Sequence, residues 1–552
     1  MQALDEEIKQ PYVNEKPEFD HVETLKPTTG KDAPVQMTLH SASQDLNTLQ
    51  ALRSFWKPSL IALALAFAAA ADGYQVGLKR HWLIANIYEG FIQTMSTETD
   101  AAGAPIISAP VLAAITSVIS AGQILGFLQI PFVSDRFGRK WAMYLMLLYL
   151  AISLFCQSFA SDWKLWLVGK LFGGIGVGCL QLVAPTYIAE IAPIRLRGAL
   201  IASYSIWFAI GQLFAPVALN QLGKQDPYEW KIPVYTQWGT LGLMILLILF
   251  FVPESPWWAA TQGKHELGRK LLLRINGDVK NYVIDVEYDI LIRTVQLEAE
   301  HSRQAKALGA TAIFRGSNLR RTLAAGWALF TTQLLGLAFL YTYVVLFFQL
   351  AGQTDVFRTT IITSCVSIAG ALVAILALDK LGRYWLINGM LSFAAIVLLI
   401  IGLVGTIGEI DTARANGLIF LACMWFFAMS FNSAAAYTML AEVPSAELRS
   451  RTAAFGSMTA SLIGLVFTVV TPYMINPNQA NWGLKTCYFF FGLSAPMVIG
   501  GWFIIPETAR LSPAELDELY ESGSPVWRFS KTITRAQGTT TDEAHPSVDV
   551  DQ

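Results

Sequence analysis

Charged residues are scarce in this chain of 552 residues. They make up 14% of it, whereas hydrophobic residues make up 54%, which is too apolar for a soluble protein of this length. All six histidines lie outside the long apolar segments, so a histidine proton relay inside a membrane is excluded. The five cysteines lie in or at the ends of those segments, and they are typical of small apolar residues rather than of a disulfide framework. We therefore expect an integral membrane protein.

Several other features are missing. The apolar segments and their connections contain no nucleophile and base pair and no metal-ligand cluster, so we expect neither an enzyme nor a metal or other cofactor. The net charge of −2 gives no reason to expect nucleic acid as a partner. The first 50 residues lack the basic and then apolar pattern of a signal peptide. We therefore expect no cleaved leader, and the first apolar segment directs insertion.

What the sequence has instead is a series of apolar segments of roughly 20 residues. A helix of that length crosses a hydrocarbon core about 30 Å thick, because it rises about 1.5 Å per residue. An open strand would leave backbone groups without partners in lipid. We predict an all-α integral membrane fold with twelve transmembrane helices, at about 59–78, 110–133, 141–160, 163–187, 199–219, 233–252, 323–350, 359–378, 385–407, 416–441, 452–474 and 484–505.

Lysine and arginine gather in the connections that follow every second span, as in "DRFGRK" and "IRLRG". The positive-inside rule then predicts that both termini are cytosolic. The chain divides into a cytosolic N-terminal tail at 1–58, a six-helix bundle at 59–252, a cytosolic helical linker at 253–322, a second six-helix bundle at 323–505 and a cytosolic C-terminal tail at 506–552.

The two sets of six spans carry the same motifs in the same order. "DRFGR" begins at Asp135 and "DKLGR" at Asp379, 244 positions later. "EIAPIRLRG" begins at Glu190 and "EVPSAELRS" at Glu442, and "PESP" at Pro253 is followed by "PETA" 253 positions later. Such matches are not expected by chance and indicate a duplicated six-helix unit.

These repeated motifs predict ion pairs at the cytosolic helix ends. The glycine of D-x-x-G-R permits a tight turn, and its Asp and Arg can meet helix dipoles or each other. We expect Glu190 to pair with Arg197 and Glu442 with Arg449, and we expect such pairs to break when the cytosolic side opens. A role in topology and folding alone is the alternative. The predicted gating residues are Asp135, Arg136, Gly138, Arg139, Glu190, Arg197, Glu254, Asp379, Gly382, Arg383, Glu442, Arg449 and Glu507.

These stretches together resemble the sugar porter family of the major facilitator superfamily. "SDRFGRK", "PTYIAEIAPIRLRG", "PESPWW", "LDKLGR" and "PETARLSPAELDELYE" look like five signatures of that family in its order, and the resemblance covers about 59–522. "DGYQ" and "AEVPSAELRSRT" are more similar to the fungal α-glucoside (maltose) permeases than to hexose carriers. The resemblance implies alternating access, in which two six-helix halves rock about a central site and the charged linker acts as a latch.

Two charged side chains fall well inside the predicted spans, Asp72 in the first and Lys170 in the fourth. Counted from the outer ends of their spans, both lie roughly 10 Å deep. A charge inside a membrane costs at least about 2.5–3.5 kcal/mol, so such residues usually pair or line a water-filled path. We expect a mutual pair in which protonation of the carboxylate acts as a switch. A static pair that joins the two helices is the alternative.

The resemblance bears on proton coupling. Many proton-coupled sugar porters have an Asp where this chain has Gln75 and an Arg where it has Lys170. The α-glucoside permeases carry an acid at the position of Asp72, which implies that Asp72 alone keeps the coupling. Facilitated diffusion without protons remains the alternative.

Polar residues in the fifth and seventh spans are candidates for sugar binding, because a sugar needs hydrogen-bonding side chains and an aromatic face. The resemblance aligns Ser205, Gln212, Thr332, Gln333 and Ala338 with sugar-contacting amides of the family. Three of those amides are replaced here, by Ser205, Thr332 and Ala338. This depletion favours a ligand other than a typical hexose, and helix-to-helix hydrogen bonding is an alternative role for each residue.

Aromatic and amide residues of the seventh and tenth spans complete the predicted substrate site. Tyr341 and Tyr343 lie at or beside the tyrosine pair of the family. In the tenth span, Asn432 and Tyr437 fall at the two tryptophan positions of hexose carriers in one register, and Phe431 falls at the first in another. The register stays open.

We therefore expect a proton symporter for an α-glucoside or related sugar, monomeric, in the plasma membrane. Its partners are a small sugar, protons and the lipid bilayer. The alternatives are a facilitated uniporter of another sugar or polyol-like metabolite and a nutrient sensor that does not transport. The 47-residue tail from Pro506 is short for such a sensor.

Overall fold

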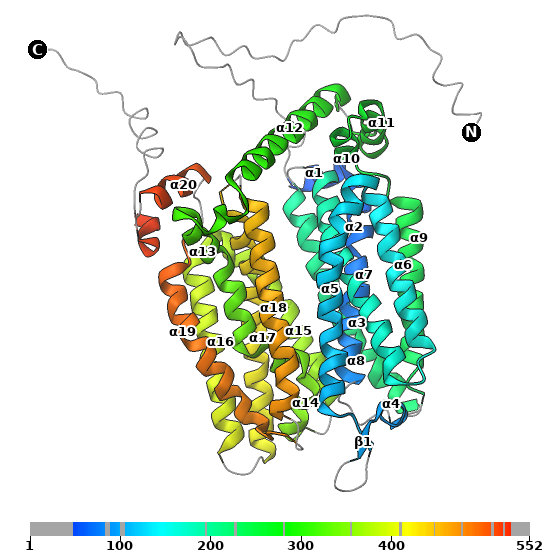
Figure 1. Cartoon of the computed structure of the whole chain (residues 1–552), viewed down its shortest axis with the longest axis vertical. Helices are drawn as coiled ribbons and strands as arrows, with labels where there is room; N and C mark the ends of the chain where they lie inside the picture. Colours follow the sequence, from blue (N-terminus) through cyan, green and yellow to red (C-terminus); the bar gives the residue numbers. More distant parts are fainter. Residues whose placement is uncertain are drawn as a thin grey trace, which may run out of the picture. The chain divides into compact units, whose positions relative to one another are not determined.

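The architecture is given by a computed structural model (Figure 1). The expected N-terminal and C-terminal tails lie largely outside the residues that the structure describes. Those residues are 48–82, 89–99, 105–193, 196–225, 229–279, 282–353, 356–407, 411–445, 448–475, 479–508, 513–522 and 525–531.

The N-terminal half is a helical bundle with one small hairpin. In the hairpin, strand β1 (Glu98–Thr99) pairs antiparallel with β2 (Pro105–Ile106). The helices of this half are α1 (Thr48–Ser54), α2 (Trp56–Ala66), α3 (Ala68–Trp82), α4 (Glu89–Met95), α5 (Ala109–Phe137), α6 (Arg139–Ser158), α7 (Trp163–Ile191), α8 (Arg197–Gln225) and α9 (Ile232–Phe251).

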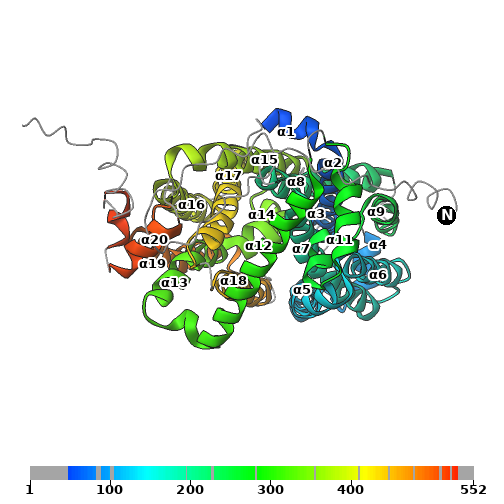
Figure 2. The same cartoon turned by 90° about the horizontal axis from the view of Figure 1, so that it is seen from above.

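Three helices and a short 3-10 turn follow as a linker. They are α10 (Pro256–Thr261), α11 (His265–Asn276), α12 (Ile284–Leu308) and the turn η3 (Ala310–Phe314). Seen from above, α12 lies across the ends of the membrane helices (Figure 2).

The C-terminal half is a second helical bundle. It consists of α13 (Gly316–Thr332), the π-helical η4 (Gln333–Thr342), α14 (Val344–Leu350), α15 (Val356–Leu381), α16 (Arg383–Thr406), α17 (Thr412–Glu442), α18 (Arg449–Ile475), the 3-10 turn η5 (Gly483–Lys485) and α19 (Thr486–Ile504). The short α20 (Pro513–Glu521) and η6 (Val526–Lys531) end the described chain.

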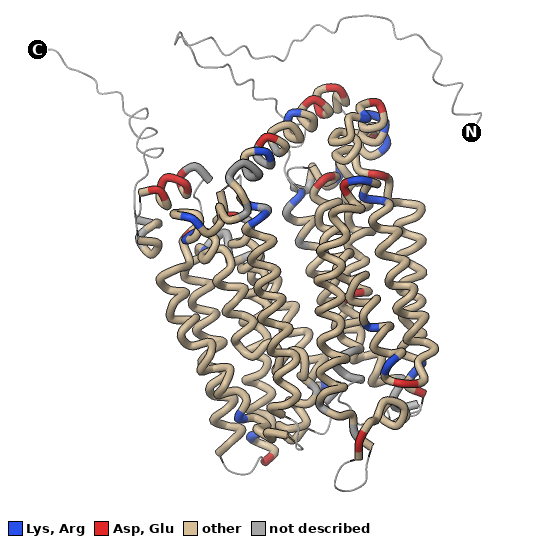
Figure 3. The backbone as a smooth tube through the Cα atoms, viewed as in Figure 1, with Lys and Arg blue, Asp and Glu red and all other residues tan. Residues whose placement is uncertain are grey.

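Apolar length explains most of these helices. Within the described residues, eleven helical segments are long and apolar enough to cross a membrane, and α15 contains a shorter apolar stretch, Arg358–Ala374, where the twelfth is expected. Acidic and basic residues gather at the ends of the helices, and few lie between (Figure 3). The prediction of an all-α, multi-pass membrane fold is therefore confirmed.

Glycine pairs let neighbouring helices of the N-terminal half approach closely. A Cβ atom added to Gly73 of α3 would lie 2.0 Å from the carbonyl oxygen of Phe208 in α8. One added to Gly211 of α8 would lie 2.0 Å from the carbonyl oxygen of Ala70. Small residues at such crossings allow backbone-to-backbone contact in a membrane. The "DGYQ" stretch thereby fixes the first span against α8.

The seventh span is broken, although its sequence predicts one continuous helix. Gly336 has φ +82° and ψ 21°, a left-handed conformation that glycine adopts without steric cost, and it interrupts the run from α13 through η4. The break frees the carbonyl oxygen of Leu335, and the indole Nε1 of Trp425 in α17 donates a hydrogen bond to it at 3.1 Å. Trp425 is fully buried. The sequence does not predict this contact, because an apolar span gives no sign of which carbonyl oxygen will need a donor.

The hydrophobic core is divided unequally between the two ends of the bundles. We call the end at α10–α12 the linker end and the end at β1 and β2 the hairpin end (Figure 1). N-terminal residues toward the hairpin end, such as Leu78, Ile115 and Leu219, belong to the same apolar cluster as the core of the C-terminal half. Those toward the linker end, such as Met143 and Ile188, form a cluster of their own. The two halves therefore share a core at the hairpin end.

Candidate functional site

Two predicted substrate residues meet between the halves. Gln212 of α8 donates a hydrogen bond from Nε2 to Tyr341 Oη at 2.6 Å, and Tyr341 Oη lies 3.0 Å from Gln212 Oε1. Tyr341 belongs to η4 and lies five residues after the break at Gly336. The side chains of Gln212 and Tyr341 therefore form a hydrogen-bonded pair at the boundary of the two bundles.

Tyr343 closes the hairpin end of the same boundary. Its side chain is fully buried, and its hydroxyl lies 3.0 Å from Thr116 Oγ1 of α5 and donates to the carbonyl oxygen of Thr468 in α18 at 3.1 Å. The buried hydroxyl thus joins a helix of the N-terminal half to one of the C-terminal half. In this conformation Tyr343 is a contact between the halves.

The other predicted substrate residues differ in exposure. Ser205 is exposed, and 60% of Tyr437 is exposed. Gln333 is partly buried, and a Cβ added to Gly464 of α18 would lie 2.8 Å from its Oε1. Thr332 is buried and donates its hydroxyl to the carbonyl oxygen of Leu329 at 2.7 Å. These positions leave Ser205 and Tyr437 the most accessible of the set.

Asn432 lies inside α17 and is fully buried. Neither its Oδ1 nor its Nδ2 has a hydrogen-bond partner among the described residues. Phe431 is buried too, so burial does not distinguish the two registers of the tenth span. An amide left without partners inside an apolar bundle costs free energy.

Asp72 lies in α3 and is 2% exposed. Its Oδ2 accepts a hydrogen bond from Gln181 Nε2 at 3.1 Å, and its Oδ1 has no hydrogen-bond partner among the described residues. Both Asp72 and Gln237 line a cavity of about 20 Å³, and Gln237 Nε2 likewise has no partner in the described part of the chain. A cavity of this size holds one water molecule. The arrangement can bridge a carboxylate and an amide through water.

The expected pair of Asp72 and Lys170 is not formed in this conformation. Lys170 is buried, and its Nζ lies 4.6 Å from the ring centroid of Trp166, over the ring. Gln181, the partner of Asp72, lies eleven residues further along α7, roughly 16 Å at helical rise. The span of Asp72 ends at Leu78 as expected, although α3 itself continues to Trp82.

The first "GR" motif builds a capped helix start. Gly138 has φ +108°, and Glu254 accepts hydrogen bonds from the backbone N–H groups of Arg139 at 2.9 Å and Lys140 at 3.2 Å. These are the first N–H groups of α6, where a carboxylate is stabilised by the helix dipole. Burial raises the pKa of Glu254, and these N–H donors with that of Ser255 counteract the rise.

The guanidinium of Arg139 joins three predicted gating positions. It donates to Glu190 from Nη2 at 2.8 Å and from Nε at 3.0 Å, and it contacts Asp135 at 3.1 Å. Arg139 and Glu190 are mostly buried, whereas Asp135 is largely exposed. Arg136 is exposed and lies over the ring of Phe137. The strong part of this cluster is therefore the buried Arg139–Glu190 pair.

The second "GR" motif repeats this geometry in the C-terminal half. Gly382 has φ +89°, and Glu507 accepts from the backbone N–H of Arg383 at 2.9 Å. Arg383 Nη2 lies 3.2 Å from Glu442 Oε1, and Thr508 donates to Glu442 Oε2 at 2.6 Å. The sequence repeat thus corresponds to a repeated structural unit.

The partners of the two acids differ from the prediction. Glu190 pairs with Arg139 and not with Arg197, and Glu442 pairs with Arg383 and not with Arg449. Both Arg197 and Arg449 are exposed at the first residues of their helices. Each of these arginines begins the helix that follows its acid, so a spacing of seven residues does not place the two side chains on one helix face. The spacing therefore did not identify the partner of either acid. The side chain of Asp379 lies outside the described part of the structure.

Two repeated helical bundles, apolar toward lipid and joined by polar contacts at their boundary, define a membrane transporter of the major facilitator type. The sugar (and other) transporter family matches residues 61–520. The chain belongs to this family, which confirms the predicted resemblance and makes the protein a transporter and not an enzyme.

Three similar proteins illustrate the relationship. A general alpha-glucoside permease of Saccharomyces cerevisiae is 28% identical over 508 residues, which are 90% of this chain and 80% of the permease. The MFS transporter fmqE of Aspergillus fumigatus is 27% identical over 528 residues, 93% of this chain and 96% of that protein. The inward-open xylose transporter XylE from E. coli has a similar fold. Its TM-score is 0.65 at 18% identity, over 83% of this chain and 99% of that one.

Proposed function

We propose that this transporter is a proton symporter for an α-glucoside or related sugar and that it works by alternating access in the plasma membrane. The substrate class is supported by the names of relatives, the general alpha-glucoside permease and the maltose permease MAL31 of Saccharomyces cerevisiae. MAL31 is 27% identical over 88% of this chain and 79% of its own length. One structure of similar fold, with 19% identity and a TM-score of 0.58, is titled a D-xylose-proton symporter.

Access from the linker end is supported by the contacts between the halves. Toward the hairpin end the two halves have a common apolar core. They are also joined there by the hydrogen bonds of Tyr341 with Gln212 and of Tyr343 with Thr116. Toward the linker end the N-terminal half has a separate core. A sugar entering there meets Ser205 and Tyr437 first, because these are the exposed candidates. Opening of the hairpin end then requires the Gln212–Tyr341 bond to break.

We assign the linker end, and with it both termini, to the cytosol. The assignment rests on the excess of Lys and Arg in the connections at that end. The proposed parts of the chain keep their sequence boundaries: tails at 1–58 and 506–552, bundles at 59–252 and 323–505 and a linker at 253–322. In this orientation the conformation described here is inward-facing.

The observation that carries proton coupling is the environment of Asp72. A charged carboxylate in the membrane interior costs at least about 2.5–3.5 kcal/mol, and a single amide, Gln181, bonds to it directly. Protonation removes that cost in this conformation. In the other conformation, water that reaches the cavity beside Asp72 would favour the charged form, because a solvated carboxylate no longer bears the cost of burial. Such a difference between conformations links proton binding to transport.

The two ion pairs at the linker end have a role in gating that differs from the predicted one. Arg139–Glu190 and Arg383–Glu442 each lie within one half, so these pairs do not bridge the halves. We propose that they hold the helix ends of each half in the shape that its partner must meet when the linker end closes. Loss of a pair would then impair closure at the linker end more than sugar binding.

Uptake measurements test the proposed function. Cells without their own sugar carriers would express the protein and be given labelled maltose, trehalose or glucose, with and without a protonophore. We expect protonophore-sensitive accumulation of an α-glucoside. Accumulation that survives collapse of the proton gradient refutes coupling, and absence of any uptake refutes these three sugars as substrates and favours another substrate or a sensor.

The Asp72→Asn variant tests the role of the carboxylate. We expect it to lose accumulation and to keep exchange of sugar down its gradient. The matched control is Asp285→Asn, because Asp285 is exposed in the linker. Unchanged accumulation in Asp72→Asn would contradict the coupling role and favour a facilitated uniporter.

A further inference from the structure

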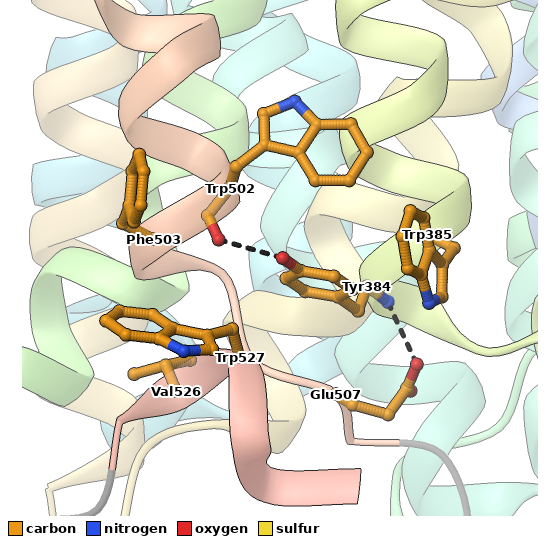
Figure 4. Close-up of a pocket in the computed structure, with 7 residues that line it drawn as sticks. All are labelled: Tyr384, Trp385, Trp502, Phe503, Glu507, Val526 and Trp527. Carbon is orange, nitrogen blue, oxygen red and sulfur yellow. Dashed lines mark hydrogen bonds between the residues drawn. The ribbon is translucent and has the colours of Figure 1, made fainter.

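A cavity outside the transport pathway lies at the linker end of the C-terminal half. It has a volume of about 440 Å³ and is formed where α16 begins, α19 ends and η6 packs beside them. Figure 4 shows the side chains around it. We call this cavity the aromatic pocket, and its lining residues are Tyr384, Trp385, Trp502, Phe503, Glu507, Val526 and Trp527.

Five of the seven lining side chains are aromatic, and they form two connected groups. The rings of Tyr384, Trp385 and Trp502 lie edge to face, with centroids 5.4–5.7 Å apart. Phe503 and Trp527 form the second group, with centroids 5.7 Å apart. Aromatic faces carry negative partial charge and attract cations, and quaternary ammonium groups bind in cages of this kind.

Hydrogen bonds hold the inner rings in position. Tyr384 Oη donates to the carbonyl oxygen of Trp502 at 2.9 Å, and Trp502 Nε1 donates to Ser392 at 3.2 Å. The outer rings remain accessible, since Trp385 is 66% and Trp527 48% exposed. The pocket therefore has fixed inner walls and an open mouth.

The charge of the wall is negative. Glu507 is the only ionisable acid or base in the lining apart from the tyrosine hydroxyl. The guanidinium of Arg383 contacts Glu442, and the carboxylate of Glu507 accepts hydrogen bonds from the backbone N–H groups of Arg383 and Tyr384. An acidic and aromatic wall favours a cation with apolar surface over an anion.

The position of the aromatic pocket identifies the source of such a cation. Trp385 is the third residue of α16 and Phe503 the last but one of α19, so the pocket lies where membrane helices end. Aromatic residues at this level contact lipid headgroups. We propose that the aromatic pocket binds the choline headgroup of a phospholipid in the leaflet at the linker end. The trimethylammonium lies against the rings and near Glu507, and the acyl chains extend along α16 and α19.

The sequence repeat supplies a matched comparison site. Trp141 of α6 lies 244 positions before Trp385 and is similarly exposed, at 63%. Its neighbour Lys140 stands where the C-terminal half has Tyr384, with Nζ 5.9 Å from the ring of Tyr144. A lysine repels a quaternary ammonium group. The N-terminal half should therefore not bind a choline headgroup at this position.

Lipid retention tests the proposal. The full-length protein would be reconstituted in vesicles of equal parts phosphatidylcholine, phosphatidylethanolamine and phosphatidylglycerol and extracted in mild detergent. Lipid bound per protein would then be measured by mass spectrometry. We expect phosphatidylcholine to be retained at least about threefold over each of the other two. Equal retention of the three lipids, or preference for phosphatidylglycerol, overturns the proposal.

Variants separate the pocket from a general aromatic belt. The double variant Trp385→Leu and Trp527→Leu should lose the preference for phosphatidylcholine, and the same positions changed to Phe should keep most of it, because the ring faces remain. Trp141→Leu should have no effect. Equal loss in Trp141→Leu, or no loss in the double Leu variant, contradicts the proposal. A variant truncated after Lys531 is a further test. If this variant prefers phosphatidylcholine and the full-length protein does not, the segment after Lys531 occupies the aromatic pocket and the proposal is overturned.

Discussion

Replacement of Gly138 by alanine tests the capped helix start at the linker end most directly. Gly138 has φ +108° and ψ 165°, a region that is essentially restricted to glycine. A Cβ at this position would also lie 2.3 Å from Glu254 Oε2. The substitution therefore strains the backbone and displaces the carboxylate that caps α6.

The loss of stability in Gly138→Ala is the sum of the backbone strain and the weakened cap. Backbone strain in this region costs about 1–3 kcal/mol. Displacement of Glu254 weakens its bonds from the N–H groups of Arg139 and Lys140, and such bonds to a charged group contribute about 1.5–3 kcal/mol each when fully formed. Water at the helix end replaces part of that loss, so we expect a total of about 2–5 kcal/mol. For a half of this size, at about 2–4 °C per kcal/mol, the melting temperature should fall by roughly 4–20 °C.

Thermal unfolding of the purified protein, followed by intrinsic fluorescence, measures this change. Gly389→Ala is the control, since Gly389 lies within α16 and a Cβ there would have nothing within 4 Å. Alanine in a helix interior is favoured by about 0.5–1 kcal/mol, so this variant should be unchanged or slightly more stable. Gly382→Ala should behave like Gly138→Ala, because its Cβ would lie 2.4 Å from Glu507 Oε2. Equal melting temperatures for Gly138→Ala and Gly389→Ala would refute the reasoning.

Three further predictions follow from single contacts. Trp425→Phe leaves the carbonyl oxygen of Leu335 without its donor and should destabilise the protein by about 1–3 kcal/mol in the same unfolding assay; a change no larger than that of the exposed Trp482→Phe would contradict this. Tyr341→Phe removes the hydrogen bond to Gln212 that joins the halves. If that bond contributes about 1 kcal/mol to closure of the hairpin end, the rate of cysteine labelling at that end should rise about fivefold. Unchanged labelling would show that the bond does not hold that end closed. Burial raises the pKa of Glu254, so the folded state binds the proton more tightly and the stabilisation by this group falls as pH rises through its folded-state pKa. The melting temperature of the wild type relative to that of Glu254→Gln should therefore be lower at pH 7 than at pH 4. A difference independent of pH would contradict a raised pKa of Glu254.

Much of the fold could be predicted from sequence because its causes are local. A run of roughly 20 apolar residues must form a helix in lipid, whatever its neighbours are. The glycine of each "GR" motif and the glutamate of "PESP" or "PETA" could be recognised because the motif occurs twice. The helix break at Gly336 could not be recognised, since glycine is common in membrane helices and the donor Trp425 is 89 positions further along the chain.

The sites were predicted less completely than the fold. Gln212 and Tyr341 were both named as substrate residues, but nothing in their spans indicated that they would bond to each other across the halves. Asp72 was recognised as a buried charge, whereas its partner Gln181 was missed. A glutamine in an apolar span gives no signal of which neighbouring helix it faces.

The sequence by itself determined that this chain crosses a membrane many times, that its two halves repeat and that a carboxylate lies buried in the first span. These properties depend on residue type and on spacing along one segment. The tertiary structure alone decided that Glu190 pairs with Arg139, that Asp72 bonds to Gln181 and lies apart from Lys170, and that the halves share a core at the hairpin end. Each of these depends on the rotation and axial offset of one helix against another. Those quantities are set by side-chain packing over the whole bundle and leave no pattern in the sequence of a single span.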